Sequence, residues 1–180
     1  GIDFRIINEL NTAARTVTAG ETDLSLNMAA QQIATARRMP DLVAEANPSM
    51  IFFTLMMNFA KPPLNDVRVR QAMNYAINRD ELNKVLMLGL GEPTSTMFPK
   101  DFWAVNAETA HFYQHDPEKA RSLLKEAGYP NGLEIETWSW PDQTSIQRIE
   151  LVGNQLEQVG IRLKITPSPP QVVNQFFYIE

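Results

Sequence analysis

Apolar and polar residues follow two different periods along this chain of 180 residues. Apolar positions spaced by three and four residues indicate amphipathic helices, whereas strict alternation indicates half-buried strands. The helical spacing predicts helices over residues 10–21, 28–39, 66–77, 79–85, 117–127 and 144–160. Alternation or short apolar runs predict strands over residues 3–8, 22–27, 50–57, 133–140 and 160–166, with another strand-like run after residue 40. Because strands and helices alternate throughout, the pattern predicts an α/β fold.

Start and stop signals support two of these helices. Asn65 or Asp66 can cap the helix that follows a Pro-rich turn, since both side chains accept hydrogen bonds from free backbone N–H groups. In HDPEKARSLLKEAGYPNG, Asp116 is the predicted cap, Pro117 the first helical residue and Gly128 the stop signal. These helices therefore have defined ends in the sequence itself.

The segment PPLNDVRVRQAMNYAINRDEL combines arginines and acids inside an apolar helical pattern. Arg68 and Arg70 lie two residues apart, so they point to different sides of a helix and cannot clamp one anion together. Asp66 and Arg70 are four apart and can pair, and Asn78 with Glu81 fits a capping box for the next helix. Helix initiation explains nearly every charge, so we interpret the segment as scaffold.

The last third of the chain predicts a βαβ unit. LEIETWSW at 133–140 alternates as a half-buried strand, and GIRLKIT at 160–166 places its aliphatic residues on one side and its basic residues on the other. The helix between them is about four turns long, which is enough for a crossover that leaves the two strands parallel.

Composition excludes several classes of protein. The net charge of −5 gives no basic surface for nucleic acid, and the lack of cysteine excludes disulfides and thiolate metal sites. The longest apolar run, residues 50–57, is too short to span a bilayer and is predicted to be a buried strand. The chain opens with GIDFRIINEL, which lacks the features of a signal peptide, and we expect it to be a piece cut from a longer protein.

Catalytic signatures are missing from the sequence. It holds no GxxxxGK[ST], GxSxG or HExxH motif, so we expect no enzyme, no catalytic residue, no metal and no cofactor. His111 and His115 precede a helix cap, where surface histidines are a better interpretation than a metal pair. Glu134 and Glu136 mark the wet side of a strand, and Trp103 with its neighbour Phe102 is expected to pack a loop onto the core.

WSWPDQTS at 138–145 is the most suggestive stretch for ligand binding. Trp138 and Trp140 lie at the carboxyl end of a predicted strand, where open α/β sheets bind ligands. With Asp142 and helix-start hydroxyls, two indoles offer an apolar platform and a few polar contacts. The alternative, in which one indole caps the core and the other covers a loop, is equally compatible with the sequence.

Two longer motifs carry a family resemblance. FAKPPLNDVRVRQAMNYAINRDEL and the later HDPEKARSLLKEAGYPNGLEI resemble the solute-binding proteins of the peptide/nickel ABC-transporter family, and FRIIN…AARTVTAGETDLS is similar to an earlier segment of that family. The resemblance covers essentially the whole chain. Asn78 stands where the family often has Asp, a change that keeps the helix cap.

The resemblance implies a lobe of the periplasmic-binding-protein type (type II, cluster C-like), with a mixed sheet flanked by helices. Residues 1–50 would belong to the first lobe or its hinge side, and residues 51–180 to the second, ligand-binding lobe, truncated at its C-terminus. The parent protein would be periplasmic or extracytoplasmic. It would bind a peptide or similar small solute between two lobes and deliver it to membrane permease subunits, without binding nucleic acid.

The resemblance also places ligand contacts at strand ends that match this sequence. The candidate ligand-binding residues are Met56, Trp138, Trp140, Asp142 and Ser145. The family's acidic residue that meets a peptide's amino terminus lies on a later strand than this sequence contains, so the ligand class remains open among dipeptide, oligopeptide, opine, sugar and metal chelate.

Two other functions compete with the receptor. The same fold can serve as the ligand-sensing domain of a transcription regulator, which a helix-turn-helix upstream would reveal. The other hypothesis is an α/β enzyme whose nucleophile lies outside this sequence, and no feature of the sequence favours it.

Overall fold

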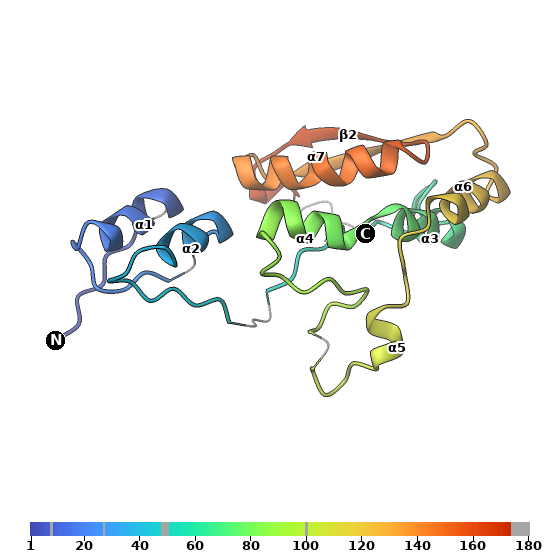
Figure 1. The fold of residues 1–180 in the computed structure, drawn as a ribbon. Coiled ribbons are helices and arrows are strands. Elements are labelled where there is room, and N and C mark those ends of the chain that lie inside the picture. Colours follow the sequence, from blue (N-terminus) through green and yellow to red (C-terminus); the bar gives the residue numbers. More distant parts are fainter. Residues whose placement is uncertain (8, 27, 48–50, 100, 174–180) are drawn as a thin grey trace. The chain divides into compact units, whose positions relative to one another are not determined.

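The structure, a computed structural model, describes residues 1–7, 9–26, 28–47, 51–99 and 101–173. Its elements in chain order are α1 (Leu10–Thr18), α2 (Ala30–Ala36), α3 (Val67–Ala76), α4 (Arg79–Met87), α5 (Ala107–Ala110), α6 (Pro117–Glu126), β1 (Leu133–Ser139), α7 (Gln143–Glu157) and β2 (Ile161–Pro167) (Figure 1). All six predicted helices are present, although α1 and α2 are shorter than their apolar patterns, and α5 is a short addition.

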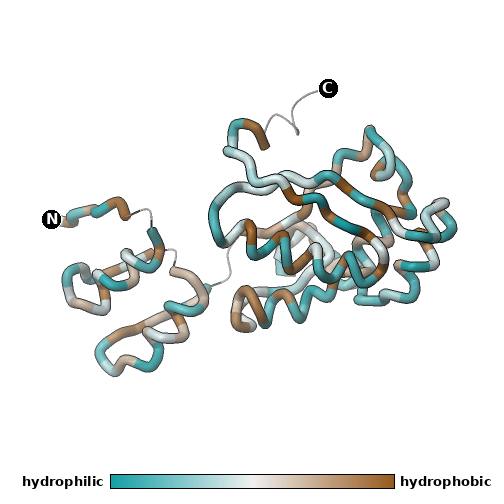
Figure 2. The backbone as a smooth tube through the Cα atoms, turned by 90° about the horizontal axis from the view of Figure 1, so that it is seen from above, coloured by the Kyte–Doolittle hydropathy of each residue, from teal (hydrophilic) through white to brown (hydrophobic). Residues whose placement is uncertain are grey.

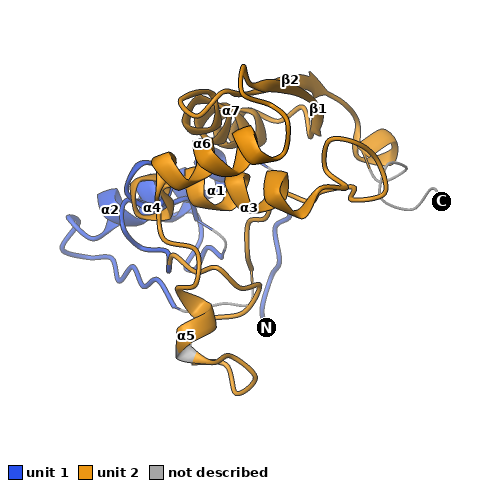
Figure 3. Ribbon diagram, turned by 90° about the vertical axis from the view of Figure 1, so that its right-hand side faces the viewer, with its two compact units in different colours: residues 1–49, 83–92 blue, residues 50–82, 93–180 orange. Residues whose placement is uncertain are grey.

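The chain divides into two compact units (Figure 3). Unit 1 comprises Gly1–Ser49 with Asn83–Glu92, and unit 2 comprises Met50–Leu82 with Pro93–Glu180. The assignment of residues 1–50 and 51–180 to two lobes of a binding protein stays a prediction.

Unit 2 is built on the predicted βαβ unit. Strands β1 and β2 pair in parallel, from Leu133 opposite Ile161 to Ser139 opposite Pro167. Helix α7 packs on this pair, and α3 packs against α6 (Figure 1). The described residues thus confirm the α/β class, although their sheet has two parallel strands where the family resemblance implied a mixed sheet.

One hydrophobic core joins these elements. Its buried members come from α3, α6, β1, α7, the turn after α7 and the start of β2: Val69, Ala72, Met73, Ala76, Ala120, Leu124, Ile135, Leu156, Val159 and Ile161. Ala positions on α3 and α6 let the two helices approach closely, while the larger side chains fill the space under the strands. This core gives the β1–α7 connection a fixed support.

The predicted helix caps are confirmed. Asp66 accepts a hydrogen bond from the N–H of Arg68 (2.8 Å), and Asp116 accepts one from the N–H of Lys119 (2.9 Å). Gly128 follows α6 with φ at 93°, a left-handed conformation that glycine adopts without a steric cost.

The arginine-rich segment is scaffold, but its pairing differs from the prediction. Asp66 forms its ion pair with Arg68 (2.6 Å) and not with Arg70. The Arg70 guanidinium instead donates to the carbonyl of Leu64 (2.7 Å), because that carbonyl lies in the turn just before the helix. Arg79 is half-buried and donates to the Asn74 carbonyl (3.1 Å). Backbone acceptors therefore hold both half-buried cations of this segment.

The predicted capping box at α4 is half formed. Asn78 Oδ1 accepts from the N–H of Glu81 (3.0 Å), as expected. The return bond is replaced by Gln155 of α7, whose Oε1 accepts from the N–H of Asn78 (2.9 Å) and whose Nε2 donates to the Glu81 carboxylate (3.1 Å). A buried amide thus links α7 to the start of α4, a contact that a local motif cannot reveal.

Unit 1 contains the predicted helices without the predicted strands. Glu9 caps α1 by accepting from the N–H groups of Asn11 and Thr12, and hydrogen bonds from Thr12 and Asn11 lower the pKa of Glu9 from 4.5 to about 2. The described parts of residues 3–8 and 22–27 are not strands, and neither is the run after residue 40.

Apolar side chains in these segments are exposed. They are Ile2, Phe4, Ile6, Leu24, Leu26 and Val43. In Figure 2 the tube near the N-terminus includes hydrophobic stretches, drawn in brown. Alternation describes a segment that can bury one face, but a strand forms only when a neighbour completes its hydrogen-bond ladder. Within the described residues these segments have no such neighbour, and the prediction of strands there was wrong.

The apolar run at 50–57 also differs from its prediction as a buried strand. Residue 50 lies outside the described residues, and residues 51–57 form no strand. Leu55 and Met57 pack against the core of unit 2, whereas Phe53 and Met56 are exposed. Phe53 shares the strand parity of Leu55 and Met57, so only part of that side packs against the core of unit 2.

Candidate functional site

The carboxyl end of β1 carries the candidate site. Trp138 lies opposite Thr166 of β2, and the N–H of Ser168 donates to the carbonyl of Ser139 (2.8 Å) just beyond the sheet. The chain then passes Trp140 and enters α7, so the end of the strand and the start of the helix are only a few residues apart. We call residues 138–148 the β1–α7 junction.

Neither indole of the junction belongs to the buried core. Trp138 is half-buried, and Trp140 is 49% exposed. On β1 the side chains of Ile135 and Thr137 are buried while Glu136 is exposed, so Trp138 shares its parity with the outer face. The junction therefore offers aromatic surface, as the ligand-binding interpretation requires.

Asp142 and Ser145 are engaged with each other. Asp142 is the N-cap of α7, and its Oδ1 accepts from the N–H of Ser145 (2.9 Å). Hydrogen bonds from the side chain and the backbone of Ser145 lower the pKa of Asp142, and the charge of Arg148 lowers it further. Both residues lie where the sequence predicted them, but their first role is to start the helix, and ligand contact from them stays a prediction.

Met56 comes from a different part of unit 2. Its side chain is 60% exposed, between the inward-packed Leu55 and Met57. The same segment reaches α7 through Phe53, because the Arg148 guanidinium carbon lies 3.6 Å from the centre of the Phe53 ring. The structure thus brings the segment 51–57 to the first half of α7.

Arg148 and Phe53 are the residues that sequence analysis missed at this site. Arg148 is half-buried, and this burial lowers the pKa of its guanidinium, while the charge of Asp142 opposes the shift. An arginine within an amphipathic helix is ordinarily a solvated residue, and no local signal links it to a phenylalanine 95 positions earlier. Only tertiary packing reveals the pair.

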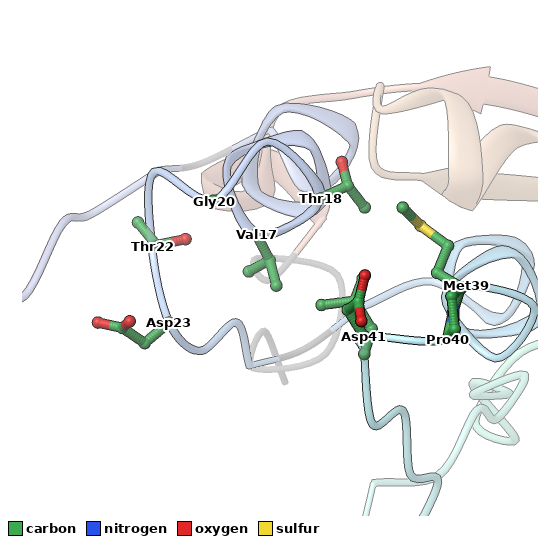
Figure 4. A pocket seen from close by; sticks show the side chains of 9 residues that line it. Val17, Thr18, Gly20, Thr22, Asp23, Met39, Pro40 and Asp41 are labelled. Atoms are coloured by element: carbon green, nitrogen blue, oxygen red, sulfur yellow. The ribbon is translucent and has the colours of Figure 1, made fainter.

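Two concavities exist elsewhere. One, of about 340 Å³, lies in unit 1 between the end of α1 and the segment after α2; Figure 4 shows Val17, Thr18, Asp23 and Asp41 around it. The other, of about 210 Å³, lies between α7 and β2 in unit 2. Neither is lined by a predicted ligand residue.

The other candidates of the sequence have plain structural outcomes. His111 and His115 are exposed, as expected for surface histidines. In the part of the chain that the structure describes, no three His, Cys, Asp or Glu side chains gather as a metal site, and no helix is long and apolar enough to cross a membrane. Phe102 stacks on Phe98 at 4.7 Å, but Trp103 is 88% exposed, so its predicted packing role was wrong.

Comparison with known proteins identifies a matching protein family. Residues 1–177 match the family described as "Bacterial extracellular solute-binding proteins, family 5 Middle". A glutathione-binding protein GsiB of Shigella flexneri is 33% identical over 166 residues, covering 92% of this chain and 32% of that protein. A GsiB of Pectobacterium atrosepticum is 34% identical over 167 residues.

Solved structures agree in fold. The periplasmic binding protein DppA of Helicobacter pylori, in complex with the peptide STSA, has a TM-score of 0.77 at 27% identity, covering 93% of this chain and 32% of that one. NikZ of Campylobacter jejuni, in complex with Ni(L-His), has a TM-score of 0.75 at 23% identity, over 91% of this chain and 35% of that one, which supports the fold alone.

The chain thus spans about a third of the length of the relatives it matches. The match to the family nevertheless runs from residue 1 to residue 177, through both units and the β1–α7 junction. This chain belongs to the family 5 bacterial extracellular solute-binding proteins.

Proposed function

We propose that this chain supplies part of the substrate receptor of an ABC importer, with the β1–α7 junction as one wall of its ligand site. The observation that supports this proposal is the incompletely covered aromatic surface of the half-buried Trp138 and the 49% exposed Trp140 at a strand's carboxyl end, in a chain of a solute-binding family. An open half-site suits this function, because a ligand held between two lobes touches each wall over only part of its surface. No bond-making chemistry is required.

The solute is a small peptide or a closely related molecule, with glutathione and short peptides as the first to test. The names of the relatives support this choice, since they include glutathione-binding proteins and a structure with a bound peptide. The receptor acts outside the cytoplasmic membrane and hands its solute to permease subunits, as expected for an extracellular solute-binding family. A ligand-sensing domain of a transcription regulator remains the alternative, which neither the family description nor these names favour.

Native mass spectrometry of the complete protein, purified from its cellular compartment without refolding, tests the receptor. We expect a small molecule that is lost on denaturation. Calorimetry with glutathione and with Ala-Ala-Ala then measures affinity, and Trp140→Ala should weaken binding at least tenfold, equivalent to about 1.4 kcal/mol.

Trp103→Ala is the matched control, because this indole is 88% exposed in another part of unit 2. It should leave affinity unchanged. Protein that arrives empty and binds neither probe would contradict the receptor for peptides, and equal losses in both variants would remove the junction from the ligand site.

A further inference from the structure

The turn between α6 and β1 has a chemical feature that the proposed function does not use. Asn131 and Gly132 form the one Asn–Gly pair in the sequence, and Asn131 is exposed to solvent. In such a pair the backbone nitrogen of glycine can attack the side-chain amide carbon of asparagine, because no Cβ on the second residue obstructs the approach. The pair is therefore a candidate site of spontaneous covalent modification.

The turn holds the attacking nitrogen in a hydrogen bond. The N–H of Gly132 donates to the carbonyl of Tyr129 (3.2 Å). This bond closes a β-turn whose two central residues are Pro130 and Asn131. To reach the amide carbon, the nitrogen has to swing round with the backbone of Asn131, and this rotation breaks the hydrogen bond. The closed turn thus opposes the reaction.

The start of the sheet restrains Gly132 from the other side. A Cβ placed on Gly132 would lie 2.3 Å from the carbonyl oxygen of Gly160, so the two backbones are already in close contact. The N–H of Leu133 donates to the same carbonyl (2.9 Å). Leu133 opposite Ile161 is also the first pair of β1 and β2. A rotation at Gly132 therefore disturbs the first pair of the sheet as well as the turn.

We propose that Asn131 is a deamidation site and that the opening of this turn controls its reaction. In the open turn the nitrogen of Gly132 loses its proton to water and bonds to the side-chain amide carbon of Asn131. The bond from that carbon to the amide nitrogen breaks, and the amide group takes up a proton and leaves as ammonia. The product is a cyclic succinimide, which water opens at either of its two carbonyls.

The two products of hydrolysis differ in their effect on the sheet. Opening at the side-chain carbonyl gives aspartate, which changes only an exposed side chain. Opening at the main-chain carbonyl gives isoaspartate, which adds a methylene carbon to the main chain just before β1. Gly132 already lies against Gly160, so the longer segment has no room there. Isoaspartate at position 131 should therefore weaken the pairing of Leu133 with Ile161, and aspartate should not.

The experiment ages the complete protein in mildly alkaline buffer, with and without concentrated urea. Peptide mapping by mass spectrometry follows the replacement of the amide by a carboxyl group at Asn131, and enzymatic methylation of isoaspartyl carboxylates separates the two products. Asn65 is the internal reference, because it is also exposed but is followed by Asp66, whose side chain obstructs the attack.

Two glycine variants test the control by the turn. Gly160→Ala places a Cβ 3.3 Å from the Cα of Gly132 and imposes a left-handed conformation (φ 93°) on alanine, so it should loosen the start of the sheet. Gly20→Ala is the matched control: Gly20 is also left-handed (φ 72°), but it lies in unit 1 with no described atom within 4 Å of the added Cβ. Gly160→Ala should speed deamidation of Asn131 severalfold, and Gly20→Ala should leave the rate unchanged.

We expect Asn131 to deamidate at least about tenfold faster in urea than in the folded protein, as for a group protected by local structure, and faster than Asn65 in urea. Isoaspartyl protein should unfold at a lower urea concentration than Asn131→Asp, which should match the wild type.

Three results would contradict the inference. Deamidation of Asn131 no faster than that of Asn65 in urea would overturn the modification site. Equal rates at Asn131 with and without urea, or an equal increase in both glycine variants, would overturn the control by the turn. Equal stability of isoaspartyl protein and Asn131→Asp would overturn the effect on the sheet.

Discussion

Two segments of unit 2 use the same residue types for different ends. In residues 66–82 an aspartate caps a helix, and the arginines have partners within the fold. Asp66 forms an ion pair with Arg68, and Arg79 donates to a backbone carbonyl. In the β1–α7 junction an aspartate again caps a helix, but Arg148 has an aromatic ring on one face and no described acceptor.

The comparison shows that composition does not separate scaffold from site. Residues 66–82 carry more charge and attract attention first, yet satisfied donors have little left to offer a ligand. The junction carries fewer charges, its indoles are incompletely covered, and its arginine stacks on Phe53. Matched substitutions in the two segments test this distinction.

The largest difference in stability should separate two Met→Ala variants, one in the core and one in the segment 51–57. Met73 of α3 is 2% exposed in the core, so Met73→Ala should lower the free energy of unfolding by about 2–5 kcal/mol through lost packing and a cavity. Met56→Ala removes a side chain that is 60% exposed and should cost about 1 kcal/mol or less. Urea unfolding measures both, and equal costs would show that the segment 51–57 is packed as tightly as the core.

A smaller difference should separate the arginines. Arg79→Met leaves the carbonyls of Asn74 and Tyr113 without their donor, which should cost about 1–3 kcal/mol of stability. Arg148→Met loses the stacking on Phe53, worth about 0.5–1 kcal/mol, and strands no acceptor. Thermal unfolding of the two variants tests this, and a larger cost at Arg148 would assign that residue to the scaffold.

The smallest stability difference concerns the helix caps. Asp116→Ala and Asp142→Ala should each cost about 1 kcal/mol, because each removes one hydrogen bond to a free N–H at the start of a helix. Equal costs would indicate that both aspartates serve as caps, and a change in ligand affinity in Asp142→Ala alone would add a ligand contact at the junction.

The pH dependence of stability should also reveal the contribution of the Asp142 cap of α7. The pKa of Asp142 is lowered in the folded chain, so its contribution to stability is complete above the unfolded pKa and is lost as the pH falls through the lowered folded value. Asp142→Asn keeps a capping oxygen but cannot titrate. The free energy of unfolding should therefore fall less steeply from neutral to acidic pH in this variant than in the wild type. Identical profiles would show that Asp142 does not contribute to the pH dependence.

Sequence analysis predicted the helices and the βαβ unit because their signals are local. The cap at Asp116, the glycine stop at Gly128 and the alternation of residues 160–166 need only neighbouring residues, and each has its predicted structure. The positions of Trp138 and Trp140 at a strand end were predictable for the same reason.

Strand pairing and long-range side-chain contacts depend on tertiary structure, and the periodicity of the sequence does not predict them. Residues 3–7 and 51–57 alternate as strands do, but an extended segment becomes a strand only if another segment supplies the ladder, and among the described residues none does so. The Gln155 link to Asn78 and the Arg148–Phe53 pair join positions far apart in the sequence. Neighbouring residues were enough to predict where the helices begin, where β1 and β2 lie and where the two indoles follow the strand, since these features depend on short-range geometry. The tertiary fold determined which arginines donate to protein acceptors and which stacks on an aromatic ring, because these partners come from distant parts of the sequence.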